Sequence, residues 1–188
     1  MPRTDAQRWN QRYLEDERFQ KTIQPKSFLV EHASLLPAWG IALDVAMGLG
    51  GNAAFLIERG LRVVGVDISD VALRRAKACL PQLMAVRADL TNFLLPSRSF
   101  DLILNFYYLE RSLWIEYRRW LRPGGLVIIE TLLLEMQACQ PDLDPAFLLE
   151  PGELKQAFSD LEILVYREGW QTTVQGHLRA VASLIARL

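Results

Sequence analysis

The chain has 188 residues, 51% of them hydrophobic, which is enough to bury one core but too few for two ordinary domains. Its 21 basic residues nearly balance its 22 acidic residues, so no global field favours nucleic acid or an anionic membrane, and a small molecule is the better-suited partner. Two cysteines and two histidines are too few for a disulfide framework or a zinc site.

Two helices are expected before the first strand. The patterns favour one helix around residues 5–19 and another around residues 27–36, ended by Pro37. We expect them to form an N-terminal helical cap, residues 1–39, that lies across the carboxyl edge of the following sheet. The opening Met-Pro-Arg-Thr-Asp contains no apolar targeting segment, and no later apolar run is long enough to span a bilayer, so we expect a cytoplasmic protein without a membrane partner.

Short apolar runs alternate with segments of helical period from Ile41 onward, which is typical of βαβ units and a parallel sheet. Gly60 is expected to end the first helix of this region and Ser69 to cap the second, which carries Ala72, Ala76, Cys79 and Leu80 on its apolar face. Pro123-Gly124-Gly125 is expected to end the third, which carries Leu113, Tyr117, Trp120 and Leu121 on one face. Strands are predicted at residues 41–46, 62–67, 83–87, 100–106 and 126–130, and the first two helices at residues 51–59 and 70–80.

The last third of the chain changes character. Residues 161–167 and 178–188 both resemble strands, and the polar stretch between them is too short for a crossover helix, so they should pair antiparallel. The sequence therefore predicts one α/β domain, residues 1–188, with a doubly wound core at residues 40–188. Its sheet should be mostly parallel, with about seven strands and a closing antiparallel hairpin, and helices on both faces.

The cysteines and histidines lie in no motif. Cys79 and Cys139 are expected to be buried or partly buried thiols in a reducing compartment. His32 lies on the apolar face of the second helix, where a satisfied, partly buried side chain is expected, and His177 lies at the entry to the last strand as a turn residue. Neither histidine is a compelling general base, and no metal site is predicted.

A glycine-rich loop follows the first strand, as Asp44-Val45-Ala46-Met47-Gly48-Leu49-Gly50-Gly51-Asn52. Ligands of open α/β sheets bind outside the carboxyl ends of the strands, where the strand order reverses. Gly48 and Gly50 would let the backbone approach a ligand closely, and Ala53 completes a G-x-G-x-x-A spacing that also suits a dinucleotide. The loop alone therefore leaves the ligand open.

Two aspartates narrow the choice of ligand. Asp44 precedes Gly48 by four residues, where its carboxylate would repel a pyrophosphate and attract an amino group, as at the aminoacyl end of S-adenosylmethionine. Its alternative role is a helix or turn cap. Asp67 ends the second strand, a position from which a carboxylate takes two ribose hydroxyls; its alternative role, capping the next helix, is already met by Ser69.

Several segments together resemble the class I S-adenosylmethionine-dependent methyltransferases, with a Rossmann-like core, from about Trp9 to the C-terminus. The resembling segments are Ala42 to Asn52 as the first motif, Val64 to Ser69 as the acidic second strand, Ala88-Asp89-Leu90 as the adenine-side loop, and Phe100 to Asn105 and Leu121 to Leu126 as the fourth-strand and fifth-strand motifs. Trp9 to Tyr13 and Phe147 to Leu154 also resemble the small tellurite-resistance and thiopurine-type methyltransferases. That narrower resemblance implies a small acceptor with a sulfur, nitrogen, oxygen or chalcogen nucleophile.

The resemblance implies S-adenosylmethionine as cofactor and a set of contacts. Asp44 and the loop backbone would face the methionine moiety, Asp67 the ribose, and Asp89 with Leu90 the adenine. Arg12, on a first helix that folds over the cofactor, would lie near its carboxylate, although an ordinary amphipathic helix is the alternative. The predicted cofactor-binding residues are Arg12, Asp44, Ala46, Met47, Gly48, Gly50, Asn52, Asp67, Ile68, Asp89, Leu90, Asn105 and Phe106.

The acceptor side is expected near Asn105-Phe106-Tyr107-Tyr108. This segment is similar to the Asn/Asp-Pro-Pro-Tyr motif of amino-group methyltransferases, but it lacks the prolines. Asn105, Tyr107 and Tyr108 are therefore candidates for acceptor contacts, the tyrosines as an aromatic wall, with core packing as the alternative.

The predicted function is methyl transfer to a small molecule by in-line displacement, in a monomer or homodimer. The cofactor makes the methyl group electrophilic, so the protein mainly has to align the acceptor. Ala46, where the family usually has glycine, and Met47, often a small residue or cysteine there, keep a second hypothesis open, a non-catalytic S-adenosylmethionine-binding protein. A nicotinamide-dependent oxidoreductase is a third. The basic cluster Arg118, Arg119 and Arg122 is interpreted as a solvated helix end rather than a nucleic-acid site.

Overall fold

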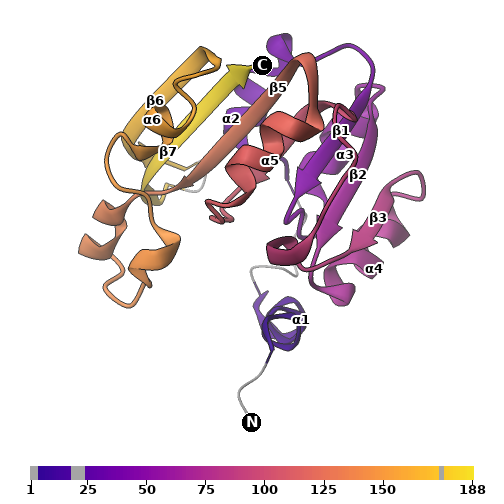
Figure 1. Ribbon diagram of the computed structural model, residues 1–188. Helices are drawn as coiled ribbons and strands as arrows, with labels where there is room; N and C mark the ends of the chain where they lie inside the picture. Colours follow the sequence, from indigo (N-terminus) through magenta and orange to yellow (C-terminus); the bar gives the residue numbers. More distant parts are fainter. Residues whose placement is uncertain (1–3, 18–23, 174–175) are drawn as a thin grey trace. The chain divides into compact units, whose positions relative to one another are not determined.

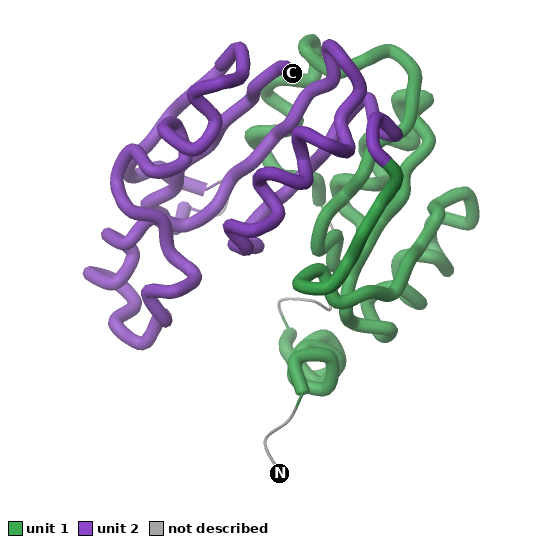
Figure 2. The backbone as a smooth tube through the Cα atoms, viewed as in Figure 1, with its two compact units in different colours: residues 1–96 green, residues 97–188 purple. Residues whose placement is uncertain are grey.

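The computed structural model describes residues 4–17, 24–173 and 176–188. The chain divides into two compact units, residues 1–96 and residues 97–188 (Figure 2). The boundary falls inside the predicted core, residues 40–188, so the assignment of one domain stays a prediction.

Unit 1 contains three parallel strands in the order β3-β2-β1 (Figure 1). All but the first residue of β1 are buried, as expected of a parallel strand covered on both faces. In order, the elements are α1 (Asp5–Glu15), α2 (Ser27–Glu31), a 3₁₀ turn (Ala33–Leu35), β1 (Ile41–Val45), α3 (Gly51–Glu58), β2 (Arg62–Asp67), α4 (Asp70–Cys79), β3 (Met84–Arg87) and a 3₁₀ turn (Leu90–Asn92).

Unit 2 contains four strands in the order β4-β5-β7-β6. β4 and β5 are parallel, and β7 pairs antiparallel with both β5 and β6. In order, the elements are β4 (Phe100–Phe106), α5 (Leu113–Trp120), β5 (Leu121–Leu132), 3₁₀ turns (Leu134–Ala138 and Pro145–Phe147), α6 (Glu153–Ala157), β6 (Glu162–Thr172) and β7 (Leu178–Arg187).

The predicted fold class is confirmed. The strand order β3-β2-β1-β4-β5-β7-β6 is that of a seven-stranded mixed sheet whose last two strands form the expected antiparallel pair. Gly60 has φ 92° directly after the C-cap of α3, and the side chain of Ser69 accepts a hydrogen bond from the amide of Ala72 at the start of α4. No helix among the described residues is long and apolar enough to cross a bilayer.

The N-terminal helices differ from their prediction. α1 ends at Glu15 because Asp16 is extended, so it does not reach residue 19, which lies outside the described residues. The predicted helix at residues 27–36 is broken at His32, whose ψ of 23° ends α2 and starts the 3₁₀ turn. Local periodicity identified both segments as helical but did not detect these ends.

The fifth strand begins earlier than predicted. The third helix of the core ends at Trp120, before Pro123-Gly124-Gly125, and residues 121–125 already belong to β5. A register shift opposite β4 accommodates them, with Gly124 at φ 78° and no room for a Cβ at Gly125, 2.9 Å from the carbonyl oxygen of Arg122. The glycines therefore shape an irregular strand rather than end a helix.

The prediction of buried thiols is wrong. Cys79 and Cys139 are both exposed and free of disulfides. Cys79 is the last residue of α4, beyond the buried positions Ala72 and Ala76 that share its helical face, and Cys139 follows a 3₁₀ turn. Helical spacing placed Cys79 on the apolar face, but that face is covered only over the earlier turns.

Candidate functional site

The glycine loop after β1 has an unusual backbone. Ala46, Gly48 and Gly50 have φ values of 51°, 58° and 80°, in the left-handed region. The loop is held to the end of β2, because the amide of Met47 donates to the carbonyl of Val66 at 3.0 Å and that of Gly48 donates to Asp67 Oδ2 at 2.8 Å. Gly48 and Gly50 adopt this conformation at little cost, whereas Ala46 is strained there.

The space beside the two loop glycines is taken by protein atoms. A Cβ on Gly48 would lie 2.9 Å from the hydroxyl oxygen of Tyr13, and a Cβ on Gly50 would lie 3.2 Å from the Cβ of Ala76. A Cβ on Gly65 of β2 would lie 2.0 Å from the sulfur of Met47. In unit 1, therefore, the glycines first of all allow close packing of α1, α4 and Met47 around the loop.

Asp44 places a buried carboxylate at the end of β1. The residue is only 1% exposed, and its Oδ2 has no hydrogen-bond partner among the described residues. Burial, and then the charge of Asp67, raises the pKa of Asp44 to about 7, opposed by the charge of Lys26 and the amide of Ala53. A buried carboxylate in need of a partner fits an ammonium group, such as that of S-adenosylmethionine.

Asp67 is an anchor for the loop as well as a candidate ribose ligand. Its Oδ2 accepts from the amide of Gly48, and its Oδ1 accepts from the amide of Ser69 at 2.9 Å. Burial raises the pKa of Asp67, opposed by these backbone amides and that of Ile68. Each carboxylate oxygen keeps further acceptor capacity, so the side chain suits two hydroxyl donors. Ser69 rather than Asp67 caps α4, because the hydroxyl of Ser69 accepts from the amide of Ala72.

α1 packs against α4 within unit 1 and brings Tyr13 to Gly48. Asn10 connects α1 to the start of α4. Its Nδ2 donates to Asp70 Oδ1 at 2.6 Å, and its Oδ1 accepts from the hydroxyl of Ser69 at 2.7 Å. Within unit 1, α1 thus lies beside the loop that follows β1, whereas the helical cap of residues 1–39 stays a prediction. Asn10 was missed as a candidate, although it lies inside the Trp9 to Tyr13 segment singled out by resemblance.

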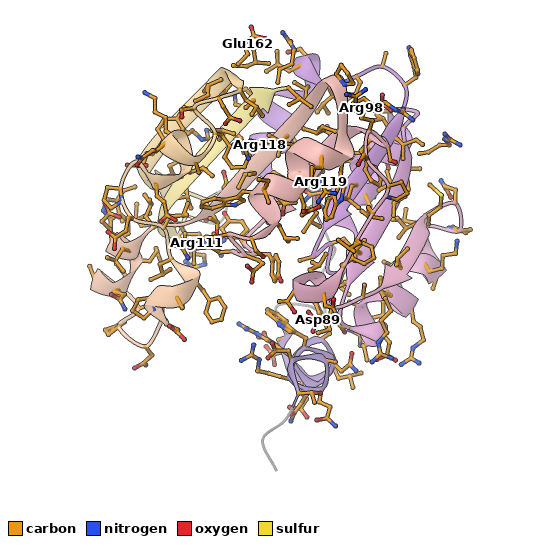
Figure 3. The ribbon with its side chains drawn as sticks, viewed as in Figure 1. Asp89, Arg98, Arg111, Arg118, Arg119 and Glu162 are labelled. Atoms are coloured by element: carbon orange, nitrogen blue, oxygen red, sulfur yellow. The ribbon has the colours of Figure 1, made fainter. Side chains whose placement is uncertain are left out.

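The other unit 1 candidates have local partners. Arg12 Nε lies 3.9 Å from Asp16 Oδ2, and the guanidinium carbon of Arg12 lies 5.0 Å from the ring centroid of Trp9. Asn52 Oδ1 accepts from the amide of Lys26 at 2.9 Å. Leu90 is buried, whereas Asp89 is exposed. The side chain of Asp89, labelled in Figure 3, accepts from the amide and hydroxyl of the residue two positions on, and these bonds lower its pKa. The cofactor roles of these residues stay predictions.

The acceptor-side candidates belong to unit 2. Asn105 and Phe106 are buried at the end of β4. Asn105 donates from Nδ2 to the hydroxyl oxygen of Tyr117 at 2.7 Å, and its Oδ1 has no hydrogen-bond partner within the described residues. This buried amide oxygen is a second polar atom that a ligand would satisfy.

Tyr107 is half-buried, and its backbone also lies in the left-handed region, at φ 59°. Its amide donates to the carbonyl of Glu130 at 2.8 Å, and its hydroxyl donates to Glu130 Oε1 at 2.8 Å. Burial and the Glu130 carboxylate raise the pKa of Tyr107, while Arg179 opposes them. The phenol is therefore a hydrogen-bond donor rather than a base. Tyr108 is partly buried.

Residues 42–125 match a protein family described as a methyltransferase domain. This segment is similar to methyltransferase domains, and its relatives include a probable S-adenosylmethionine-dependent methyltransferase from Mycolicibacterium smegmatis, 28% identical over 95 residues. Trans-aconitate 2-methyltransferase from Azoarcus sp. (strain BH72) is 38% identical over 95 residues, which cover 47% of this chain and 37% of that protein. The chain thus spans little more than a third of the length of this curated relative.

Solved structures share the methyltransferase fold. An S-adenosylmethionine-dependent methyltransferase from Methanosarcina mazei has a TM-score of 0.70 and 18% identity, over 84% of this chain and 96% of that one. TehB from Haemophilus influenzae has a TM-score of 0.73 and 18% identity, over 95% of this chain and 66% of that one. These likenesses show the fold alone, so the narrower resemblance stays a prediction. S-adenosylmethionine is confirmed as the cofactor of the matched domain.

The basic cluster lies at the amino ends of β4 and β5, the ends opposite Asn105. Arg118 pairs with Asp160 at 2.6 Å, Arg119 with Glu116 at 2.9 Å, and Arg122 with Asp101 at 2.6 Å. Arg118 and Arg119 line a cavity of about 550 Å³ together with Arg98 (Figure 3). All three guanidinium groups are paired with acids. However, Arg118 packs on the Phe158 ring with its side chain 20% exposed and Arg122 belongs to β5, so only Arg119 fits the predicted solvated helix end.

Both histidines have structural surroundings. His32 is partly buried, with Nδ1 2.9 Å from the carbonyl oxygen of Phe28 and its ring centroid 4.6 Å from that of Phe28. His177 is exposed, and its amide donates to the hydroxyl of Thr173 at 3.1 Å. Within the described ranges, no group of three or more acidic, histidine or cysteine side chains is arranged to hold a metal ion.

Proposed function

We propose that the whole chain is an active methyltransferase that transfers a methyl group from S-adenosylmethionine to a small-molecule acceptor by in-line displacement. The observation that carries this proposal is the unpartnered Oδ2 of Asp44, buried at the end of β1 inside the matched methyltransferase segment. A buried carboxylate without a partner costs several kcal/mol, which a cationic ligand group offsets.

Each candidate residue has a role in this proposal. Asp44 holds the cofactor's ammonium, and Asp67 accepts from the ribose hydroxyls while it keeps the Gly48 amide in place. Asp89 and Leu90 contact the adenine. The bound cofactor supplies an electrophilic methyl group, so the remaining task of the protein is to exclude water and orient the acceptor. Asn105, Tyr107 and Tyr108 are the candidates for that orientation.

The acceptor is proposed to arrive already ionised or otherwise nucleophilic. Tyr107 keeps its proton because its pKa is raised, and Nδ1 of His32 lies 2.9 Å from the carbonyl oxygen of Phe28. A thiolate, a chalcogen oxyanion or a carboxylate needs no general base. The name of the Azoarcus relative, trans-aconitate 2-methyltransferase, refers to a small organic acid and supports an acceptor of this size.

The setting is proposed to be the cytoplasm, with the protein a monomer or homodimer and no nucleic-acid or membrane partner. The two exposed free thiols support a reducing compartment, where they persist without pairing. The near balance of 21 basic and 22 acidic residues supports a small-molecule partner.

Calorimetry and label transfer test the proposal together. We expect S-adenosylhomocysteine to bind the wild-type chain, and Asp44→Asn to weaken that binding at least tenfold, about 1.4 kcal/mol. Methyl-labelled cofactor should transfer label to at least one member of a panel of thiols, selenite, tellurite, amines and carboxylic acids.

The second candidate is a non-catalytic S-adenosylmethionine-binding protein. The observation that favours it is the strained Ala46, φ 51°, at a position where the family usually has glycine. Binding of the cofactor without transfer to any acceptor in the panel would support this candidate, and absence of binding would contradict both.

A further inference from the structure

A polar cluster is built around Glu130 within unit 2, which we call the Glu130 cluster. Its five members are Tyr107, Glu130, Arg167, Arg179 and Ser183. Glu130 is 6% exposed and Ser183 is fully buried, each within a run of buried and mostly apolar strand residues. The hydroxyl of Tyr107 donates to Glu130 Oε1 and that of Ser183 donates to Oε2, each at 2.8 Å. Arg167 lies 3.6 Å from Oε2.

Strand register places Glu130, Ser183 and Arg167 on one face. Phe106 of β4 is opposite Glu130 of β5, Glu130 is opposite Ser183 of β7, and Ser183 is opposite Arg167 of β6. Directly opposed residues of paired strands point to the same side of a sheet. Arg179 precedes Ser183 by four residues on β7, so it shares that face too.

Arg179 lies beyond the carboxyl end of β5. The last residue pair between β5 and β7 is Leu132 with Val181. Arg179 lies two positions before Val181 in the sequence of β7, beyond this last pair. Its guanidinium carbon lies 5.3 Å from the ring centroid of Tyr107, which directly follows β4. Arg179 and Tyr107 therefore lie just outside the carboxyl ends of two parallel strands, which is where α/β proteins bind ligands.

The charges of the cluster do not balance. Both oxygens of Glu130 already have partners in Tyr107, Ser183 and Arg167. Arg179 makes no ion pair with an acid among the residues that the structure describes, and it is partly exposed. The cluster thus holds two guanidinium groups and one carboxylate, and Arg179 is the guanidinium group that lies beyond the carboxyl end of β5.

We propose that the methyl acceptor carries a carboxylate group and that Arg179, stacked on Tyr107, binds it. This inference rests on the proposed function and names the chemical class of its methyl acceptor. A guanidinium held against an aromatic ring is oriented in advance and matches a carboxylate with two parallel hydrogen bonds. A cationic acceptor would be repelled, and a neutral one would leave the charge uncompensated.

Calorimetry on the full chain with citrate as probe tests this inference, with and without saturating S-adenosylhomocysteine. We expect citrate to bind and its neutral trimethyl ester not to bind. Arg179→Met should weaken citrate binding at least tenfold and Arg179→Lys should restore part of it, while S-adenosylhomocysteine binding stays unchanged. Arg98→Met, a matched loss of charge beside the cavity at the amino ends of β4 and β5, should leave citrate binding intact.

The inference is overturned if citrate fails to bind, if the ester binds as well as the acid, or if Arg179→Met binds citrate like the wild type. Its failure is distinct from that of the proposed function. Normal binding of S-adenosylhomocysteine without citrate binding rejects only the acceptor class. Arg179-dependent citrate binding in a chain that does not bind S-adenosylhomocysteine rejects only the cofactor.

Discussion

At the scale of single residues, Asp44 is a buried carboxyl whose pKa is raised. Its buried carboxyl has a pKa of about 7, against an ordinary value of 3.8, because burial and Asp67 disfavour the charge more than Lys26 and the Ala53 amide favour it. The folded chain therefore retains this proton at pH values where the unfolded chain has lost it. A bound ammonium reverses the balance and favours the charged form.

The pH dependence of stability follows from this carboxyl. The stability that it contributes is fully present below pH 3.8 and is lost as the pH rises through about 7. We expect Asp44→Asn to remove this decline and to make the chain without cofactor more stable than the wild type at pH 8, by a few kcal/mol. Urea unfolding between pH 5 and pH 8 measures the free energy of unfolding of both proteins. Parallel pH profiles of that free energy would contradict the prediction.

Ala46 gives a second prediction at the residue scale. Its left-handed backbone, φ 51°, costs an L-residue roughly 1–2 kcal/mol. Glycine removes that strain but increases the entropy of the unfolded chain, by about 0.4–1 kcal/mol. We therefore expect Ala46→Gly to raise the free energy of unfolding by about 0.5–1 kcal/mol.

Ala78→Gly is the matched control for this change. Ala78 is exposed in α4, where glycine should lower the free energy of unfolding by about 0.5–1 kcal/mol. Denaturant titration of both variants gives the comparison. A loss of stability in Ala46→Gly equal to that in the control would show that the position carries no strain.

At the scale of elements, Asn10 and Tyr13 tie α1 to α4 and to the glycine loop. Asn10 connects it to Asp70 and Ser69 at the start of α4, and Tyr13 covers Gly48. Removal of Asn10 would leave polar groups of α4 without these partners, at a cost of about 1–3 kcal/mol. The loss should affect the docking of the helix more than the rest of unit 1.

We expect Asn10→Ala to increase hydrogen exchange in the amides of α1 at least tenfold, without a matching increase in β1. Gln11→Ala is the control, because the Gln11 amide bonds to Glu15 of its own helix. It should change exchange far less. Equal exchange of α1 in the Asn10 variant and the wild type would mean that other contacts hold the helix.

Strands were more predictable than the ends of helices. β2 and β4 have their predicted bounds because apolar runs in parallel strands contrast sharply with the polar loops around them. The break at His32 and the early start of β5 at Leu121 depend on single dihedral angles and on a register shift. Those features arise from tertiary pairing, which local periodicity does not contain.

At the scale of the whole molecule, the candidate site residues also differed in how well the sequence predicted them. Asp44 lies near the end of the first predicted strand and Asp67 ends the second, so sequence position alone identified both as candidates. Arg167 and Ser183 lie far from Glu130 in the chain, and only the register of β5, β6 and β7 brings them to it. A charged residue inside the apolar run from Leu126 to Leu132 was the one local signal.

Cofactor binding should also stabilise the whole chain by mass action. At a ligand concentration of 100 times Kd, the gain is about 2.7 kcal/mol, which for a chain of this size corresponds to a rise in Tm of roughly 5–10 °C. We expect S-adenosylhomocysteine to produce this rise and Asp44→Asn to abolish most of it, because the ammonium then meets a neutral amide.

NADH should produce no rise in Tm, since the carboxylate of Asp44 repels a pyrophosphate. Thermal unfolding with each ligand measures the difference. A rise with NADH and none with S-adenosylhomocysteine would instead support the nicotinamide-dependent oxidoreductase.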